Sequence, residues 1–566
     1  MKGVTFARFS LLAASCMFAT SGRAQEKVDV QTIERIKSEA LERSQIMDIM
    51  SWLTDVYGPR LTWSPNLAKA SDWAVQQLKS WGIQNAHLER WDTPAGIGWA
   101  NERFAFNAVS PNPFIVEAVP RAWSAGTNGK VTGAAVRVQV DCLAELQQKY
   151  VGKLNGAFIL PTAPVANPVN EFNALASRQS DSSLARMAAA QLPPADGGRG
   201  GAGGGGRGGR GGNGAPADAP PVSAVCQQAQ AAAAAAGGRG GRGGLNTSDT
   251  TTLRWMQQQG VAAILLGGRG SSNSIGGDIA TDNGASRAKG ATQVPFVHVA
   301  TESYGRIARM LERNQPVMLE LDMQNRFYPE NTSSANVVGD IPGTDPALKD
   351  EIVMIGGHFD SWHSGTGATD NAAGSGVMLE AMRILRKLNL QPRRTIRIAL
   401  WTGEEQGLYG SCAYTKAHFG TFDSTGFKPT TEQARMSAYF NLDNGSGKIR
   451  GVYAQSNPAV VPIFDAWMGP FKEMGMKTMN IGNTGSTDHI AVDALGVPGF
   501  QFIQDGLDYG SRTHHTNQDV YERVQPDDMK FNAAVLAAFA WQAAKRDQKL
   551  PRKDPPKVRD PRAFCT

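Results

Sequence analysis

Residues 351–376, EIVMIGGHFDSWHSGTGATDNAAGSG, decide the fold. They open with the apolar run 352–355, which predicts a buried strand. His358 and Asp360 follow at the carboxyl end of this strand, and Asp370 stands ten residues further on, ahead of a run of small residues that opens a helix. A histidine and an aspartate that reach the same strand-end crevice are what a metal site in an open α/β sheet requires.

Three further predicted strands end in polar side chains of the same kinds. Residues 395–401 (TIRIALW) lead into adjacent glutamates, residues 437–443 end in an aspartate, and the strand at 498–504 precedes two histidines. Two neighbouring carboxylates after a buried strand are costly unless a cation lies beside them. Because adjacent side chains of an extended chain point to opposite sides, one glutamate can bind a metal while the other faces a substrate. The polar residues of ligand type at the four strand ends are His358 with Asp370, Glu404 with Glu405, Asp443, and His515.

Each of these residues has an ordinary structural explanation when it is taken alone. His358 fits a hydrogen-bonded core histidine, Asp443 fits a strand-end cap, and the glutamate pair fits a solvated turn. Their joint arrival at successive strand ends favours a metal site instead.

Five short motifs of this region occur in one order: His-x-Asp, Thr-Asp-Asn-Ala-Ala-Gly, Glu-Glu-x-Gly-Leu-x-Gly-Ser, Asn-Leu-Asp and His-Thr-x-x-Asp. In this order they resemble the co-catalytic dizinc exopeptidases, a family that includes bacterial leucyl aminopeptidases, carboxypeptidase Q and glutamate carboxypeptidases. The motifs cover about residues 350–520, and the wider similarity spans nearly the whole mature chain apart from a glycine-rich tract. The resemblance implies an α/β fold with a mixed, mostly parallel sheet flanked by helices, of the phosphorylase/hydrolase-like kind.

The same resemblance implies two zinc ions. His358 and Asp443 would hold one ion, Glu405 and His515 would hold the other, and Asp370 would bridge the two. Each ion then has three protein ligands, which leaves room for a shared water. A cis peptide bond directly after the bridging aspartate belongs to the same pattern.

Roles for the uncoordinated residues also follow from the resemblance. Glu404 would take a proton from the attacking water and return it to the leaving amine. Asp360 would orient His358 through its second ring nitrogen, and Asp519 would do the same for His515.

The other histidines receive no metal-binding role from the sequence. His514 is interpreted as a neighbour of the site, because the His-Thr-x-x-Asp frame selects His515. His489 lies in residues 485–500, which resemble the family's Ser-Asp-His stretch and could line the pocket, whereas His363 stays unassigned. The histidines outside any motif are interpreted as structural, namely His87, His298 and His418.

Residues 1–24 predict a secretory signal and hence an exported protein. Lys2 and Arg8 precede an apolar segment, and small residues at its end suit a cleavage site. No other apolar run is long enough to span a bilayer. Four cysteines remain after cleavage, and Cys142 with Cys226 is the predicted disulfide pair.

The formal net charge of +6 does not indicate a nucleic-acid partner. Residues 1–24 and the glycine-rich tract 190–244 each carry three more positive than negative charges, so the rest of the chain is neutral overall. The tract, with its GGRGGAGGGGRGGRGG run, cannot bury enough apolar surface to offset its conformational entropy, which predicts disorder. Because no aromatic residues accompany its arginines, the tract favours a loop expansion over a nucleic-acid-binding segment.

The composition of the chain and its pattern of predicted elements indicate five parts. Between about 121 and 335, short strands alternate with a few helices, which resembles the protease-associated domain that such peptidases carry as an insertion. The predicted parts are a signal peptide (1–24), the first part of the peptidase domain (25–120), a smaller inserted α+β protease-associated-like domain (121–335), the catalytic part (336–548) and a solvated basic, proline-rich tail (549–566).

The leading hypothesis is a zinc exopeptidase that cleaves peptides or dipeptides at a chain end. An aminopeptidase is the first choice, and a carboxypeptidase Q-like dipeptidase or carboxypeptidase is the alternative. A glutaminyl cyclase shares the fold but uses one zinc, and the presence of both His358 and Asp443 disfavours it. A binding homologue that has lost catalysis is disfavoured by Glu404 and the full ligand set. The sequence leaves open the chain end that is cut, the side-chain preference and homodimerisation.

Overall fold

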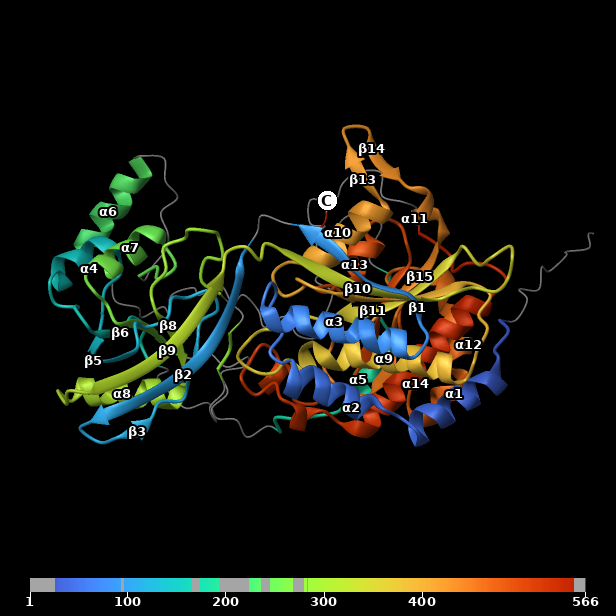
Figure 1. Cartoon of the computed structure of the whole chain (residues 1–566), viewed down its shortest axis with the longest axis horizontal. Helices are drawn as coiled ribbons and strands as arrows, with labels where there is room; N and C mark the ends of the chain where they lie inside the picture. Colours follow the sequence, from blue (N-terminus) through green and yellow to red (C-terminus); the bar gives the residue numbers. More distant parts are fainter. Residues whose placement is uncertain are drawn as a thin grey trace, which may run out of the picture.

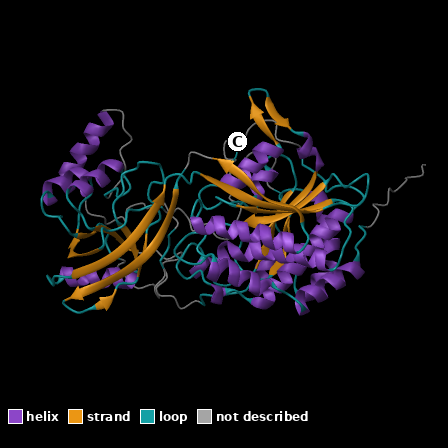
Figure 2. Cartoon of the chain, in the orientation of Figure 1, coloured by secondary structure: helices purple, strands orange, loops and turns teal. Residues whose placement is uncertain are grey.

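The structure is a computed structural model that describes residues 26–92, 96–164, 174–192, 223–235, 245–267, 279–281, 284–553 and 565. Within these residues, the strands form two eight-stranded sheets and one two-stranded hairpin. The two large sheets lie side by side along the long axis of the molecule, and each has helices of its own (Figure 1, Figure 2).

The first sheet is mixed, with a parallel centre. Strands β12, β11, β15 and β18 run parallel to one another, whereas β1, β10 and β16 join antiparallel neighbours. The predicted α/β fold class is therefore confirmed. In spatial order the strands are β1 (Gln84–Asp92), β10 (Ser333–Ile341), β12 (Thr395–Trp401), β11 (Ile352–His358), β15 (Met436–Asn441), β18 (Gly499–Gln504), β16 (Ile449–Tyr453) and β17 (Thr478–Asn480).

Helices cover both faces of the first sheet (Figure 1). Alternate side chains of β11 reach the two faces, because Val353 and Ile355 join one buried cluster while Ile352 and Met354 join the other. The first face packs against α1 (Val30–Glu42), α2 (Ile46–Ser51), α3 (Pro65–Ser80), α9 (Ala373–Lys387), α12 (Val461–Met468) and α14 (Pro526–Lys545). The second face packs against α10 (Tyr409–His418), α13 (His489–Asp493) and the hairpin of β13 (Gly420–Asp423) and β14 (Gly426–Pro429), which α11 (Thr431–Arg435) follows.

Two helices show how the local sequence sets their ends and their burial. Helix α3 begins at a typical N-cap, since the Ser64 side chain accepts a hydrogen bond from the Leu67 N–H at 3.2 Å and Pro65 occupies the first turn. Helix α14 is buried along most of its length against the core of the first sheet. Among the described residues, no helix is long and apolar enough to cross a membrane.

The second sheet lies between β1 and β10 in the sequence. Its helix α8 (Thr301–Glu312) packs on one face, and α4 (Leu143–Tyr150) and α7 (Thr250–Gln258) pack on the other. In spatial order its strands are β3 (Phe114–Ile115), β2 (Gly98–Ser110), β9 (Met318–Tyr328), β5 (Lys130–Arg137), β6 (Phe158–Leu160), β7 (Ala263–Gly267), β8 (Phe296–Val299) and β4 (Ala118–Pro120). Since β2, β3 and β4 precede residue 121, the second sheet begins earlier than the predicted boundary. A relation to protease-associated domains stays a prediction.

Several predicted segments differ from the structure or lie outside it. The predicted signal at 1–24 lies outside the described residues, as do 193–222 and 236–244 of the glycine-rich tract. Within that tract, however, Ala224–Ala235 form helix α6, because Cys226 anchors them against α4 through a disulfide. In the predicted solvated tail, Leu550 is buried, while Arg552 donates to the carbonyls of Gln433 and Met436, so residues 549–553 belong to the folded body.

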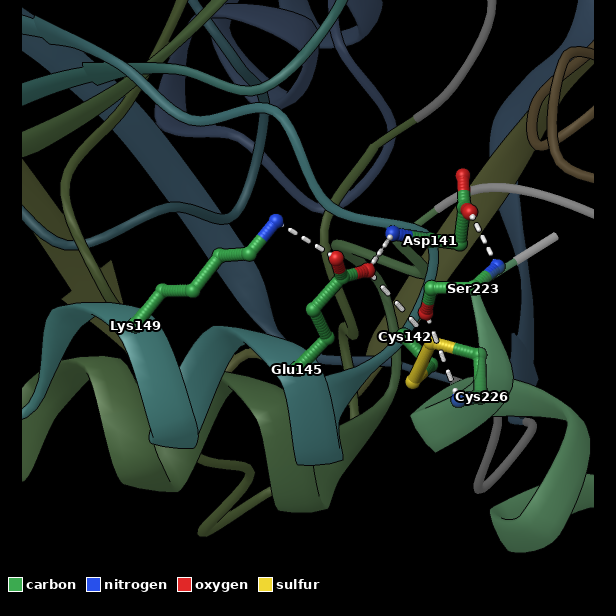
Figure 3. The surroundings of a disulfide bond; sticks show 6 residues. All are labelled: Asp141, Cys142, Glu145, Lys149, Ser223 and Cys226. Carbon is green, nitrogen blue, oxygen red and sulfur yellow. Dashed lines mark hydrogen bonds and ion pairs between the residues drawn. A yellow bond between two sulfur atoms is a disulfide. The ribbon is translucent and has the colours of Figure 1, made fainter. Parts of the chain in front are cut away.

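Two disulfides join distant parts of the chain. The Cys142–Cys226 pair predicted from the sequence is confirmed, with Cα atoms 5.7 Å apart. Figure 3 shows Glu145 beside it, where the carboxylate accepts from the Asp141 N–H at 2.9 Å and pairs with Lys149 at 2.6 Å. The second disulfide, Cys412–Cys565, ties α10 to a residue near the end of the chain.

His418 gives the fold a pH-dependent contribution to stability. Its ring bridges Glu432 at 2.9 Å and Glu89 at 2.8 Å, and these hydrogen bonds raise the pKa of His418 to about 9. Because this folded pKa exceeds the unfolded value of 6.5, the contribution is complete below about pH 6.5 and disappears as the pH rises through about 9. The difference in Tm between wild type and His418→Gln is therefore expected to be larger at about pH 6 than at about pH 9.5. Equal differences in thermal unfolding at both pH values would contradict this role.

Candidate active site

The parallel strands of the first sheet bring polar residues to one edge. Strand β11 ends at His358, β12 is followed by Glu404 and Glu405, β15 is followed by Asp443, and the loop after β18 carries His515. Because β12, β11, β15 and β18 are neighbours in this order, their carboxyl ends meet at one edge of the sheet.

His358 lies at the centre of the first group of metal-binding atoms. Its Nε2 is 3.1 Å from Asp370 Oδ1 and 3.4 Å from Asp443 Oδ1. The three ligand atoms lie within 4.8 Å of one another, and His358 and Asp370 are buried. Burial opposes the charged form of His358, but the charges of Asp443 and Glu404 outweigh it and raise the pKa of His358 well above its usual range.

His515 lies at the centre of a second group. Its Nε2 is 3.0 Å from Glu405 Oε2 and 3.3 Å from Asp370 Oδ2. His514 also approaches this group: its ring stacks on His515 with centroids 3.8 Å apart, and its Nε2 is 3.8 Å from Asp370 Oδ2. Asp370, His514 and His515 are close enough to hold a metal together. The structure therefore brings the five predicted ligands together and places His514 nearer than the sequence frame suggests.

A bound cation would stabilise the carboxylates of this cluster. Three of their oxygens are buried without a hydrogen-bond partner: Asp370 Oδ2, Glu405 Oε1 and Asp443 Oδ1. Buried carboxylates are costly unless they are paired or bind a metal, and carboxylate oxygens with imidazole nitrogens form a donor set that zinc accepts. The residues present therefore fit a metal centre.

Glu404 precedes Glu405 in the turn after β12, and among the described residues neither glutamate belongs to a group of three ligand atoms that lie within 4.8 Å of one another. Burial raises the pKa of Glu404 well above the usual range, and the nearby charge of Asp443 acts in the same direction. Burial likewise raises the pKa of Glu405, and the charge of Asp370 acts in the same direction. The two glutamates thus stand in similar surroundings, but only Glu405 contacts a histidine of the cluster, at 3.0 Å from His515.

Asp360 acts on the glutamate pair as well as on His358. His358 Nδ1 lies 3.0 Å from the main-chain carbonyl of Asp360 and 3.7 Å from its carboxylate, so the carbonyl makes the closer contact. The fully buried carboxylate accepts hydrogen bonds from the Glu404 N–H at 3.2 Å, the Glu405 N–H at 3.3 Å and the Thr62 hydroxyl at 2.8 Å. Asp360 therefore fixes the turn that presents both glutamates.

Replacing Asp360 by asparagine is expected to weaken binding of a divalent metal by about 10- to 100-fold. The new amide NH₂ would face main-chain N–H donors, so the glutamate turn would lose part of its support. Zinc titration of the metal-free protein against a competing chelator measures the effect. Asp72→Asn, at an exposed position of α3, is the matched control. Wild-type zinc affinity in Asp360→Asn would contradict the assigned role.

Asp519 holds the backbone before Asp370 instead of orienting His515. Its carboxylate accepts from the N–H of Thr369 at 2.6 Å and from the N–H of Asp370 at 3.0 Å. These contacts correct the role predicted for it, because the carboxylate accepts from two buried main-chain N–H groups that need a partner. The peptide bond between Asp370 and Asn371 is cis, as the resemblance implies.

Arg60 is a buried cation beside the cluster that the sequence did not single out. Its guanidinium donates to main-chain carbonyls at 2.7–3.0 Å, and burial lowers its pKa to about 10, so it stays charged at neutral pH. The acceptors are Leu53, Phe359, Thr366 and Gly367. Arg60 thereby ties the loop between β11 and Asp370 to the helical layer. An arginine after a proline carries no sequence signal for this role.

Asp488 is a second residue that sequence reasoning missed. It is fully buried, burial raises its pKa to about 7, and it accepts a hydrogen bond from the Ser411 hydroxyl. It belongs to residues 485–500, so the resemblance of that stretch was the available signal. The neighbouring His489 is buried, and its Nε2 contacts the Thr484 carbonyl at 3.1 Å.

A separate cavity of about 290 Å³ lies where the two large sheets and their helices meet. His363 lines it and contacts the Pro120 carbonyl at 2.7 Å through Nε2. Other lining residues come from both bodies, among them Leu61, Trp99, Phe104 and Val119. The cavity places His363 at the junction of the two bodies and outside both groups of metal-binding atoms.

The strand-end cluster of imidazoles and carboxylates defines an α/β protein with a candidate metal centre. Residues 336–540 match the sequence profile described as Peptidase family M28. The matched segment contains all five predicted metal ligands and Glu404.

The relatives share part of their length with this chain. Carboxypeptidase Q from Mus musculus is 28% identical over 263 residues, which cover 46% of this chain and 53% of that protein. Leupeptin-inactivating enzyme 1 from Streptomyces exfoliatus is 26% identical over 234 residues, which cover 38% of this chain and 50% of that protein. The chain thus spans about half the length of the curated relatives it matches.

The fold also occurs among solved structures. A peptidase M28 precursor from Shewanella amazonensis SB2B superimposes with a TM-score of 0.58 at 23% sequence identity, over 93% of this chain and 98% of that chain. At this identity the likeness supports the fold.

Proposed function

We propose that this protein is a zinc-dependent exopeptidase that hydrolyses peptide bonds at the end of peptides or in dipeptides. The position of Asp370 carries the proposal, because its Oδ1 lies 3.1 Å from His358 Nε2 while its Oδ2 lies 3.3 Å from His515 Nε2. A carboxylate that faces two separate histidines suits a bridge between two metal ions. The match of residues 336–540 to the profile of peptidase family M28 supports the same proposal.

The reaction follows from this arrangement and from Glu404. When bound, two zinc ions supply Lewis-acid polarisation of the scissile carbonyl and lower the pKa of water. Glu404 accepts a proton from the attacking water while the water oxygen bonds to the carbonyl carbon. Glu404 then returns this proton to the leaving amine when the C–N bond breaks. Asp360 holds the glutamate turn in place through two main-chain N–H groups.

The direction of cleavage separates the two candidate activities. Aminopeptidase activity is the first choice, on the resemblance of the motif order. Carboxypeptidase Q-like activity is the alternative, and the relatives of that name support it.

Hydrolysis of free dipeptides, compared with N-acetylated and C-amidated forms, tests the proposal with purified protein and added zinc. If acetylation abolishes cleavage and amidation does not, the protein is an aminopeptidase; the reverse pattern identifies a carboxypeptidase. If both modifications abolish cleavage, it is a dipeptidase. If nothing is cut although zinc is bound, the peptidase proposal is wrong.

We also infer that the protein is exported. Residues 1–24 have the pattern of a secretory signal, and two disulfides suit an oxidising compartment. Cell fractionation with detection of the protein outside the cytoplasm tests this inference; a wholly cytoplasmic protein would contradict it.

A further inference from the structure

The loop that carries His515 leaves the first sheet after β18. We define the His515 loop as residues 505–517. Two of its residues, Leu507 (φ 46°) and His515 (φ 59°), have left-handed backbone conformations. Such conformations cost free energy for residues other than glycine and persist only where surrounding contacts impose them. The contacts that hold the His515 loop therefore decide where its imidazole lies.

One set of contacts comes from residues 174–189, which we call the α5 segment after its helix α5 (Asp181–Ala188). In sequence it lies between β6 and α6 of the second sheet, but Figure 1 shows α5 among the helices of the first sheet. Leu184 packs there against Tyr453 and Ile503. The α5 segment therefore belongs in sequence to a connection of the second sheet, but it packs against the first sheet.

The α5 segment makes hydrogen bonds and ion pairs with the first half of the His515 loop. The Ser177 N–H donates to the Leu507 carbonyl at 3.0 Å, so the pair forms an antiparallel bridge at one left-handed residue. The Arg178 guanidinium pairs with Asp505 at 2.8 Å and with Asp528 at 2.7 Å. Both carboxylates are buried, and Arg450 also pairs with Asp505, at 2.9 Å. Arg178 therefore joins the start of the loop to α14.

A second set of contacts comes from Ile279–Thr281, which lie between β7 and β8 of the second sheet. The Thr281 N–H donates to the His515 carbonyl at 2.9 Å, and its hydroxyl lies 3.3 Å from the same oxygen and 2.6 Å from the Ser364 hydroxyl. The Ile279 N–H donates to the Asn517 side chain at 2.8 Å. Ile279 and Thr281 are both buried, so this short ladder holds the second left-handed residue.

We propose that these two segments of the second sheet's chain position His515 for metal binding. The other histidine, His358, extends from β11 of the first sheet itself. The metal position at Glu405 and His515 therefore depends on the second sheet's chain, whereas the position at His358 and Asp443 does not. This inference rests on the two-metal centre of the proposed function.

Zinc binding to full-length variants, measured by titrating metal-free protein against a competing chelator, tests the proposal. Arg178→Glu is expected to retain one zinc with wild-type affinity and to bind the other at least about tenfold more weakly. Arg178→Lys keeps one charged donor and is expected to recover most of the affinity. Arg186→Glu makes the same charge change on an exposed position of α5 and is expected to match wild type.

Thr281→Val tests the second set of contacts without a change in charge. It removes the hydroxyl and keeps the main-chain N–H, so a loss of about three- to tenfold in affinity for the same zinc is expected. Thermal unfolding of the metal-free variants separates positioning from general destabilisation. Thr281→Val should bind this zinc more weakly although its Tm stays near that of wild type. If Arg178→Glu does not fold, Thr281→Val decides the outcome.

The outcomes distinguish this inference from the proposed function. If wild type binds two zinc ions and both variants bind them with wild-type affinity, the positioning role is wrong and the exopeptidase proposal stands. Equal weakening of both zinc positions would also contradict the positioning role, because it predicts an effect on one. If wild type itself does not bind two zinc ions, the proposed metal centre fails.

Discussion

Glu404→Gln is expected to lower kcat for peptide hydrolysis by about 10³-fold while zinc stays bound. Glutamine keeps the shape of the side chain but cannot accept a proton from water or pass one to the leaving amine. Glu404 is not one of the five proposed zinc ligands, so zinc content should be unchanged. Steady-state kinetics on a cleaved dipeptide, together with zinc analysis of the same sample, measures both quantities.

Glu330→Gln is the matched control, because it makes the same change at an exposed residue just before β10. It should retain wild-type kcat and zinc content. Substantial activity in Glu404→Gln would show that another group moves the proton, and loss of zinc would show that Glu404 is a ligand.

Asp370→Ala is expected to have the second large effect, on metal binding itself. Its two oxygens face the two histidines at 3.1 and 3.3 Å, so one substitution removes a ligand from both positions. Loss of an outer partner of a metal ligand already costs about 10- to 100-fold in affinity, and loss of a shared ligand should cost at least about 100-fold at each position. Activity should fall below detection at the zinc concentration that saturates wild type.

Asp350→Ala makes the same change at an exposed residue before β11, at the end of the strand opposite the cluster. It should bind zinc like wild type. Retention of one zinc with wild-type affinity in Asp370→Ala would mean that Asp370 serves a single ion, and the bridge would then be wrong.

The central strands of the first sheet could be predicted because they are largely apolar runs with their own local signal. Residues 352–355 and 395–401 are examples, and both correspond to central parallel strands, β11 and β12. The start of the second sheet could not be predicted, since β2 is a strand by any local pattern and only its pairing with β9 assigns it to that sheet. Helix α6 was not predicted because Ala224–Ala235 lie in a tract whose overall composition predicts disorder.

The candidate site shows the same division between local and distant information. His358, Asp370 and Glu405 lie in short motifs, and the structure brings them together. The partners of Asp519 could not be predicted, because they depend on which N–H groups the folded loop leaves unpaired. The role of Arg60 could not be predicted, because its acceptors are all main-chain carbonyls and these leave no pattern in the sequence.

The most direct test of the central claim is a zinc titration of metal-free protein that follows peptide hydrolysis and bound zinc in the same samples. A two-metal centre built on Asp370 predicts that full activity returns only when two zinc ions are bound per chain. Full activity at one zinc per chain, or two bound zinc ions without any hydrolysis of peptides by a folded protein, would contradict it.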